Sequence, residues 1–402
     1  MTKDILSYRI KNIKPSPTIA VTSKARELKE KGKDIIGLGA GEPDFDSPEH
    51  IKNAAISAIK QGKTKYTAVD GISALKEAIK KKFKNDNNLE YSLEEISVGT
   101  GGKQVLYNVF QATLNKDDEV IIPAPYWVSY PDMVMLADGK PVILPTKLEN
   151  NFKIDLIDLE KSINPKTKWI ILNSPSNPTG TCYDRYEIER IAEVLEKYSH
   201  VNIISDDIYE KILYSDKNFY TIAQFSSNLK NRTLTVNGVS KAFSMTGWRI
   251  GYAGGPSSII KAMAKIQSQS TSNPTSISQY AALEALTSSQ DFIIKNCEVF
   301  KIRRNLITEI INNIDGLDCN IPEGAFYIFP SINGILGKKN DKGNIIKDST
   351  SFSEFLLDYA GVAVVPGIAF GMEGHFRISY ATSEEVLIEA GKRIAEACKK
   401  IY

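Results

Sequence analysis

The chain has 402 residues, of which 42% are hydrophobic and 24% are charged, as in an ordinary globular protein. Its formal net charge is +2 and most basic residues are scattered, which argues against nucleic acid or an anionic membrane as a partner. No run approaches the ~18 apolar residues of a membrane span, and the first ten residues lack the apolar segment of a signal peptide. The four cysteines lie far apart without metal-binding spacing, so we expect reduced thiols, no metal site and a cytoplasmic location.

The N-terminal region predicts few regular elements before the first long run of alternating structure. We expect an irregular arm over residues 1–16, a helix over Thr18–Lys31 and a short strand over Asp34–Gly37. A helix should begin after Ser47-Pro48, because serine caps a helix well and proline suits its first turn. Another helix should begin near Gly71.

From residue 95 to residue 255, apolar β-type runs alternate with segments of helical pattern such as Lys103–Leu114 and Tyr186–Tyr198. The predicted strands are Ile96–Val98, Glu119–Ile122, Pro141–Leu144, Trp169–Leu172, Asn202–Ser205, Leu234–Val236 and Ile250–Ala253. This alternation predicts an α/β fold with a mostly parallel sheet flanked by helices on both faces. Ligands of such sheets bind beyond the carboxyl ends of the strands, so residues that directly follow these runs are candidate site residues.

A second, smaller α+β unit should follow helices over residues 256–314. Its predicted elements are the strand Phe326–Phe329, the helix Phe352–Tyr359, the strands Val362–Val365 and Phe376–Ser379, and a last helix over Ser383–Lys400. We therefore expect a large domain over residues 48–300. The small domain should combine the N-terminal arm, residues 1–47, with residues 301–402.

One lysine, Lys241, stands in a segment over residues 237–252 that is otherwise poor in charge. It lies between two predicted buried strands, Thr233–Val236 and Arg249–Ala253. Desolvation lowers the pKa of a lysine and produces the free amine that a nucleophile or Schiff base needs. From spacing alone, a functional amine and an ordinary loop lysine are equally compatible with this segment.

Two glycine-rich loops could approach a ligand. Gly39 and Gly41 do not belong to a G-x-G-x-x-G pattern, and no helix follows them directly, so a dinucleotide fingerprint is disfavoured. The segment from Gly99 to Lys103 follows a strand and opens a helix, although its spacing is not that of a Walker loop. Its free N–H groups and helix dipole would suit an anion, and a bare tight turn is the alternative.

Four further residues follow or interrupt the predicted strands. Asn177 stands in a turn made rigid by two prolines, which could hold its side chain toward a cleft. Asp206 could contact a ligand or cap a helix, and Trp127 could be a ligand contact or a cap on the core. Arg377 is isolated in an apolar strand, so it should pair with a buried acid or grip a ligand carboxylate through two parallel hydrogen bonds.

Taken together, these motifs resemble the class I, fold-type I aminotransferases that depend on pyridoxal phosphate. The order Asn177, Asp206-x-x-Tyr209, Lys241 and Arg249 is that of the family, with similar intervals. The resemblance covers essentially the whole chain, from Lys14-Pro15 to the Arg377 strand. Bacterial aspartate aminotransferases that often also accept prephenate are the most similar branch.

This resemblance implies that Lys241 binds pyridoxal phosphate covalently and then moves the substrate's α-proton. Trp127 would stack on the cofactor ring, with Tyr126 as the alternative, and Asp206 would keep the ring nitrogen protonated. Asn177 and Tyr209 would reach the phenolic oxygen. The residues implied at the phosphate are Gly101, Gly102, Lys103, Ser240, Arg249 and, across the interface of a homodimer, Tyr66. Those implied at the substrate are Gly39, Trp127, Asn177, Arg377 and Lys14.

Two departures from the vertebrate-type branch bear on the substrate. Gly238 stands where that branch has a serine, and the segment Gln267–Asn273 lacks the arginine that binds a side-chain carboxylate there. Lys103 or Lys14 would supply that charge instead. The resemblance implies aspartate and 2-oxoglutarate as substrates, with prephenate as a further candidate. Alternatives are an aromatic or alanine aminotransferase or a lyase on this scaffold, a nicotinamide-dependent oxidoreductase, and a pyridoxal phosphate-binding regulator.

Overall fold

The computed structural model describes residues 5–13, 15, 17–214 and 218–402. Its largest sheet has seven strands in the order β2-β8-β7-β6-β5-β3-β4. These strands are β2 (Ile96–Gly99), β3 (Glu119–Ala124), β4 (Lys140–Pro145), β5 (Thr167–Asn173), β6 (Asn202–Asp206), β7 (Thr233–Gly238) and β8 (Gly251–Gly254). β8 runs antiparallel to both of its neighbours, and the other neighbouring pairs are parallel. The expected α/β fold with a mostly parallel sheet is confirmed.

Helices cover both faces of this sheet, as the alternation of side chains along β5 shows. Trp169 and Ile171 belong to one core cluster, and Ile170 and Leu172 belong to another on the opposite face. The first cluster includes residues of α5 (Gly102–Thr113), α6 (Ser129–Leu136) and α10 (Ser257–Ser268). The second includes residues of α7 (Leu156–Ser162), α8 (Arg185–Glu196) and α9 (Ser227–Lys230). Burial on both faces explains why β5 contains the continuous apolar run Trp169–Leu172.

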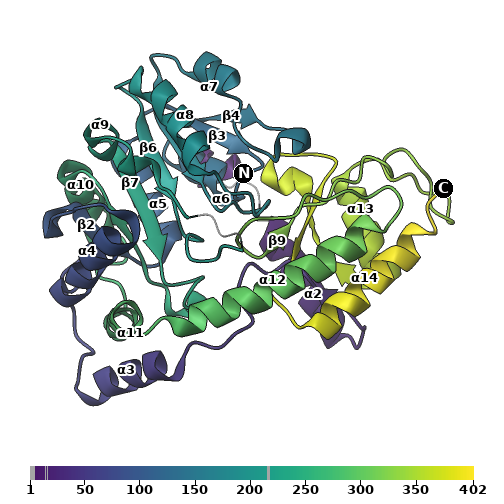
Figure 1. Ribbon diagram of the computed structural model, residues 1–402, viewed down its shortest axis with the longest axis horizontal. Helices are drawn as coiled ribbons and strands as arrows, with labels where there is room; N and C mark the ends of the chain where they lie inside the picture. The colour runs from purple at the N-terminus through teal and green to yellow at the C-terminus, as the bar shows by residue number, and fades with distance from the viewer. Residues whose placement is uncertain (1–4, 14, 16, 215–217) are drawn as a thin grey trace.

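A second unit lies beside the large sheet (Figure 1). Its strands form one three-stranded antiparallel sheet, β11-β12-β9, and one parallel pair, β1-β10. They are β1 (Ile36–Gly37), β9 (Tyr327–Ile328), β10 (Val362–Ala363), β11 (Val365–Pro366) and β12 (Phe376–Ser379), accompanied by α2 (Pro17–Glu30), α13 (Ser349–Phe355) and α14 (Glu384–Cys398). The long helix α12 (Asp291–Asn312) runs from the region of α3 (Glu49–Lys60), α4 (Ser73–Asn87) and α11 (Ser276–Thr287) into this unit (Figure 1).

Two local predictions need correction. The stretch Val362–Val365 is not one strand, because β10 pairs with β1 while β11 pairs with β12, and Val364 separates them. The N-terminal arm is not wholly irregular, since Tyr8–Lys11 form the short helix α1. Its Tyr8 hydroxyl and Arg9 guanidinium contact Asp138, just beyond α6, so tertiary contacts stabilise a helix too short to be stable alone. Within the described ranges, every helix is too short or too polar to cross a membrane.

The strand directions bring distant parts of the chain to one edge of the large sheet. β2, β3, β5, β6 and β7 all end at this edge, since β8 lies antiparallel between β2 and β7. At the same edge, Gly251 of β8 packs directly against the first turn of α5. A Cβ atom built on Gly251 would lie 2.2 Å from the backbone nitrogen of Gly102. Because Gly251 has no side chain, the N-terminus of α5 can pack directly against the sheet.

We expect Gly251→Ala to lower the free energy of unfolding by about 1–3 kcal/mol, because the new methyl group would meet backbone atoms that cannot turn away. Gly247→Ala, in the turn that precedes β8, is the control, since no atom lies within 4 Å of a Cβ built there. Urea unfolding of both variants checks this. Equal stability of the two variants would contradict the close contact.

Candidate active site

A cavity of about 340 Å³ opens at the carboxyl edge of the large sheet, and residues of β9 and β12 in the second unit complete its wall. Most of the residues singled out in the sequence line it. They are Gly102, Lys103, Trp127, Asn177, Asp206, Tyr209, Ser240, Lys241, Arg249 and Arg377. The loops after β3, β5, β6 and β7 therefore converge as the parallel-sheet argument predicted.

The other candidate residues have different positions. Gly101 precedes α5 with φ +79°, and a Cβ atom there would lie 2.3 Å from the Arg249 guanidinium. Gly39 lies next to the cavity, where its carbonyl accepts a hydrogen bond of 2.6 Å from Arg377. Tyr66 is 89% exposed and lies outside the cavity of its own chain. Lys14 lies outside the described residues.

Lys241 follows β7 and is secluded by a loop 200 residues away in the chain, because its Nζ donates to the backbone carbonyl of Gly41. The same nitrogen lies 5.8 Å from the ring centroids of Tyr209 and Phe326. Burial lowers the pKa of Lys241 to about 8, and the positive charge of Arg377 acts in the same direction. This environment favours a functional amine over an ordinary solvated loop lysine.

Asp206 ends β6 and is buried at the base of the cavity. Burial raises the pKa of its carboxyl to about 6, although hydrogen bonds from Tyr130 and from the backbone N–H of Ile208 oppose the shift. The Tyr130 bond is 2.6 Å long. A turn rather than an α-helix follows Asp206, so the helix-cap interpretation is not supported. The carboxylate is instead available to a ligand group that can donate a proton to it.

Arg377 lies in β12 and is almost completely buried. Its Nη1 donates to the side-chain oxygen of Asn177 at 2.8 Å, its Nη2 donates to Gly39, and its Nε has no hydrogen-bond partner. The guanidinium lies 4.5 Å from the ring centroid of Tyr327. Among the residues that the structure describes, it forms no salt bridge, so the expected alternative of a buried internal acid fails there. A buried cation without an acidic partner favours an anionic ligand.

A second anion-binding corner lies at the N-terminus of α5. The first turn of α5, which begins at Gly102, presents free backbone N–H groups there, and Ser240, Lys103 and Arg249 complete the corner. Burial, together with the nearby charge of Arg249, lowers the pKa of Lys103. The Lys103 amine lies 4.9 Å from the ring centroid of Trp127. This corner could hold a phosphate or carboxylate group at some distance from Arg377.

Trp127, rather than Tyr126, is the aromatic residue of the cavity wall. Its indole packs edge-to-face on Tyr130, with ring centroids 5.3 Å apart. Tyr126 turns away and packs against Gly371, where a Cβ atom would lie 2.4 Å from its ring. The preference for Trp127 in the sequence analysis agrees with this placement.

Three residues that shape the cavity were not among the candidates predicted from the sequence. Tyr130 holds Asp206, and Tyr327 lies between Tyr209 and Arg377. Asn173 donates to the backbone carbonyl of Asp206 at 2.8 Å and accepts from the backbone of Asn177 at 3.0 Å. Of these, Tyr130 had a usable signal, because it lies one helical turn after Trp127. Tyr327 stood inside a predicted strand, where alternation places every second residue on one face.

Comparison with known proteins identifies the family. Residues 33–394 match the family model described as aminotransferase class I and II. A "Probable aspartate/prephenate aminotransferase" from Rickettsia felis is 60% identical, covering 99% of this chain and 97% of that protein. The "Aspartate/prephenate aminotransferase" of Cereibacter sphaeroides is 57% identical, covering 98% of both chains.

Solved structures agree with the sequence comparison over the same length. The aspartate aminotransferase from Rhizobium meliloti superposes with a TM-score of 0.97 at 52% identity and covers 100% of both chains. The aspartate aminotransferase from Thermus thermophilus with maleate has a TM-score of 0.92 at 45% identity, covering 98% of this chain and 100% of that one. Since family model, relatives and folds coincide over nearly the full length, this chain belongs to the class I and II aminotransferases.

Proposed function

We propose that this protein transfers the amino group of L-aspartate to 2-oxoglutarate, giving oxaloacetate and L-glutamate, and that it also accepts prephenate. The observation that carries the proposal is the pairing of two groups in one cavity. Lys241 provides a secluded amine with a lowered pKa, and Arg377 provides a buried cation with no acidic partner in the described chain. The names of relatives that are 53–60% identical support the choice of substrates.

The cavity fits pyridoxal phosphate as its cofactor. The N-terminus of α5 and the Arg249 guanidinium suit the phosphate, and Gly101 leaves room for that guanidinium because it has no side chain. Asp206, buried and paired with Tyr130, suits a protonated ring nitrogen, and Trp127, which lines the same cavity, would stack on the ring. When bound, this cofactor supplies an electron-withdrawing ring that stabilises negative charge at the substrate's α-carbon.

Each charged residue then has a defined task. Arg377 binds the α-carboxylate through two parallel hydrogen bonds, and its unpartnered Nε is available for one of them. Lys241 takes up the α-proton and returns it, which suits an amine whose pKa of about 8 lies near the working pH. Asp206, in its ionised form, would keep a proton on the ring nitrogen of the bound cofactor.

A cation must also meet the second carboxylate of aspartate. Gln267 cannot replace the missing arginine, because its side chain is buried and donates to the backbone carbonyls of Val69 and Val98 at 2.6 and 2.9 Å. Lys103 is the candidate within the described cavity wall. Lys14 is the second candidate from the sequence. A lysine accepts several carboxylate geometries, which suits an enzyme that takes both aspartate and prephenate.

We further propose a cytoplasmic homodimer. The high exposure of Tyr66 supports a role outside its own cavity, at the cofactor phosphate of the neighbouring subunit. The four free cysteines support a reducing compartment. Within each subunit, the large domain would span residues 48–300, and the small domain would combine residues 1–47 with 301–402.

The visible spectrum of the protein tests cofactor and substrate together. With pyridoxal phosphate we expect a yellow protein that bleaches on adding aspartate alone and recovers its colour on adding 2-oxoglutarate. A yellow protein that aspartate leaves unchanged would contradict the substrate. A protein that stays colourless with added pyridoxal phosphate would contradict the cofactor.

Lys241→Ala should abolish transamination and leave the fold intact, because the amine is bound by a single backbone carbonyl, that of Gly41. Lys342→Ala, at an exposed lysine on the second unit, is the control and should retain full turnover. Steady-state kinetics and a thermal melt of both variants check this. Near-normal turnover of Lys241→Ala would exclude the proposed mechanism.

Arg377→Met should lower kcat/KM for aspartate by about 30-fold or more, because the buried carboxylate clamp is lost. Its melting temperature should fall only modestly, since the guanidinium donates to the Asn177 side chain and the Gly39 carbonyl but no acid in the described chain depends on it. Arg303→Met is the contrasting variant, because the buried Arg303 forms a salt bridge of 2.8 Å to Asp44 that this change removes. A large loss of stability in Arg377→Met would indicate a structural role instead.

Asp206→Asn should make the cofactor-free protein more stable at pH 8 by roughly 2–3 kcal/mol. Burial raises the pKa of Asp206 from 3.8 to about 6, so the folded state holds the proton more tightly than the unfolded state. The protonated carboxyl of Asp206 therefore contributes to the stability of the folded protein below about pH 4, and this contribution is lost as the pH rises through about 6. Asparagine does not titrate, so the variant does not lose stability in this range. Urea unfolding at pH 8 and pH 4 should show the advantage of the variant at pH 8 alone.

The matched control is Asp207→Asn. Burial raises the pKa of Asp207 to about 7, so this change should also stabilise the cofactor-free protein at pH 8. Asp207 does not line the cavity, and its carboxylate accepts from Ser205 instead. We therefore expect weakened pyridoxal phosphate binding for Asp206→Asn and unchanged binding for Asp207→Asn. Equal cofactor affinity of the two variants would contradict the role of Asp206.

A further inference from the structure

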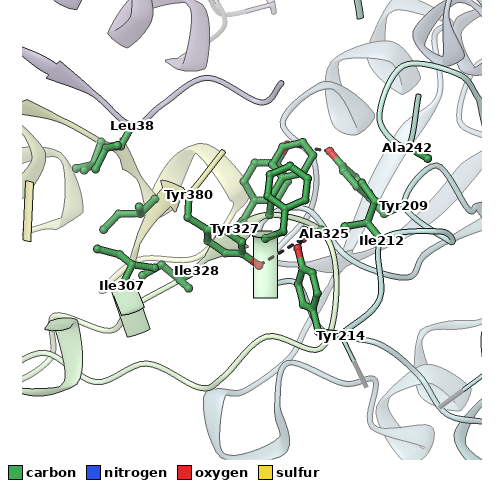
Figure 2. Packing of buried hydrophobic residues seen from close by; sticks show 14 of the residues in the cluster. Leu38, Tyr209, Ile212, Tyr214, Ala242, Ile307, Ala325, Tyr327, Ile328 and Tyr380 are labelled. Atoms are coloured by element: carbon green, nitrogen blue, oxygen red, sulfur yellow. Dashed lines mark hydrogen bonds between the residues drawn. The ribbon is translucent and has the colours of Figure 1, made fainter. Parts of the chain in front are cut away.

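We propose that Tyr327 is a positioning residue, whose hydroxyl orients the hydroxyl of Tyr209 toward the bound cofactor. The inference rests on the proposed function and on the role that the family resemblance implies for Tyr209, which would contact the phenolic oxygen of pyridoxal phosphate. Both tyrosines are buried and line the cavity, and their hydroxyl oxygens lie 2.8 Å apart (Figure 2). Tyr327 comes from β9 of the second unit, whereas Tyr209 follows β6 of the large sheet.

Each of the two hydroxyls has a single proton, and this determines which tyrosine donates the hydrogen bond between them when a ligand is bound. A tyrosine hydroxyl has one proton to donate and can accept further hydrogen bonds. If Tyr209 donates its proton to a ligand oxygen, its own oxygen can accept the proton of Tyr327. The two hydroxyls then form a chain that ends at the ligand, and hydrogen bonds in such a chain strengthen one another. Tyr327 therefore acts on the ligand through Tyr209.

The backbone that carries Tyr327 is held rigidly. Ala325, two residues earlier, has φ +56°, a conformation that alanine rarely adopts. Its carbonyl accepts hydrogen bonds from the hydroxyls of Tyr214 and Tyr380, which approach it from different elements (Figure 2). Its N–H donates to the carbonyl of Ile212 at 3.0 Å. This clamp fixes the start of β9 and thus the direction of the Tyr327 side chain.

The ring and the hydroxyl of Tyr327 have separable contacts. The ring packs against the Arg377 guanidinium, whose carbon lies 4.5 Å from the ring centroid. The hydroxyl lies beside Tyr209 and beside Gly41, where a Cβ atom would lie 3.0 Å from the hydroxyl oxygen. Phenylalanine at this position keeps the ring under Arg377 and removes only the hydroxyl. A phenylalanine variant therefore isolates the hydrogen bond from the packing.

The test is a visible pH titration of the pyridoxal phosphate-loaded enzyme. A hydrogen bond donated to the phenolic oxygen favours its ionised form, so a weaker bond raises the pKa of the bound chromophore. We expect Tyr327→Phe to raise that pKa by about 0.5 unit and Tyr209→Phe to raise it further. KM for aspartate should stay within about twofold for Tyr327→Phe, because phenylalanine keeps the ring under Arg377 and twofold corresponds to a change of only about 0.4 kcal/mol in binding.

Three further variants distinguish an effect through Tyr209 from an effect of the ring on Arg377 and from the loss of any buried hydroxyl. In the double variant, Tyr327→Phe should add nothing to the pKa shift of Tyr209→Phe, because it acts through that residue. Tyr327→Leu should raise KM for aspartate as well, because it also removes the ring under Arg377. Tyr91→Phe is the control, since it removes a buried hydroxyl bonded to Thr235 outside the cavity, and its chromophore should titrate as in the wild type.

Two outcomes would overturn the inference alone: an unchanged chromophore pKa in Tyr327→Phe, or additive shifts in the double variant. Failure of the wild type to bind pyridoxal phosphate would overturn the proposed function, and with it the inference. The two failures are distinguishable, because the first can be observed only if the wild-type protein binds the cofactor and its chromophore titrates normally.

Discussion

Desolvation of charge at the carboxyl edge of the large sheet is the constraint on which the site depends. Asp206 and Arg377 are buried and Lys241 is half-buried, and in each case burial shifts the pKa in the direction that favours the neutral form. Such groups destabilise a fold unless they are paired or later bound. The two extensive apolar clusters on the faces of the sheet provide the stability that tolerates them.

The charges are arranged so that a single zwitterionic complex would compensate them. The cavity holds cations at two separated places, Arg377 on β12 and Arg249 near the N-terminus of α5. The principal buried acid, Asp206, lies at the end of β6 between contributions from several loops. A ligand with an anionic group at each end and a proton donor between them would pair with all three and would relieve the desolvation of Arg377 and Asp206. The buried charges that destabilise the empty protein are therefore the same charges that the ligand would bind.

A further set of polar residues orients the side chains that would contact the ligand. Tyr130 holds the Asp206 carboxylate, Asn173 connects the ends of β5 and β6, and Tyr327 contacts both Tyr209 and Arg377. Catalysis by positioned groups requires such support, because a small displacement of a reacting atom has a large effect on rate. Since Tyr327 and Arg377 come from the second unit, the cavity is complete only where that unit meets the large sheet.

The sequence by itself determined the elements and the candidate chemistry. Short apolar runs that alternate with segments of helical pattern predicted the seven strands, and the residues after those runs were the ones that converge at Lys241. These signals are local, so they can be read from a few neighbouring residues. The tertiary structure alone decided that Arg377 has no acidic partner in the described chain, that Val362–Val365 divides between two sheets, and that Tyr327 lies beside Tyr209. The physical reason is that partners, burial and pKa depend on contacts between distant segments, such as the one between Lys241 and Gly41, and no local pattern encodes them.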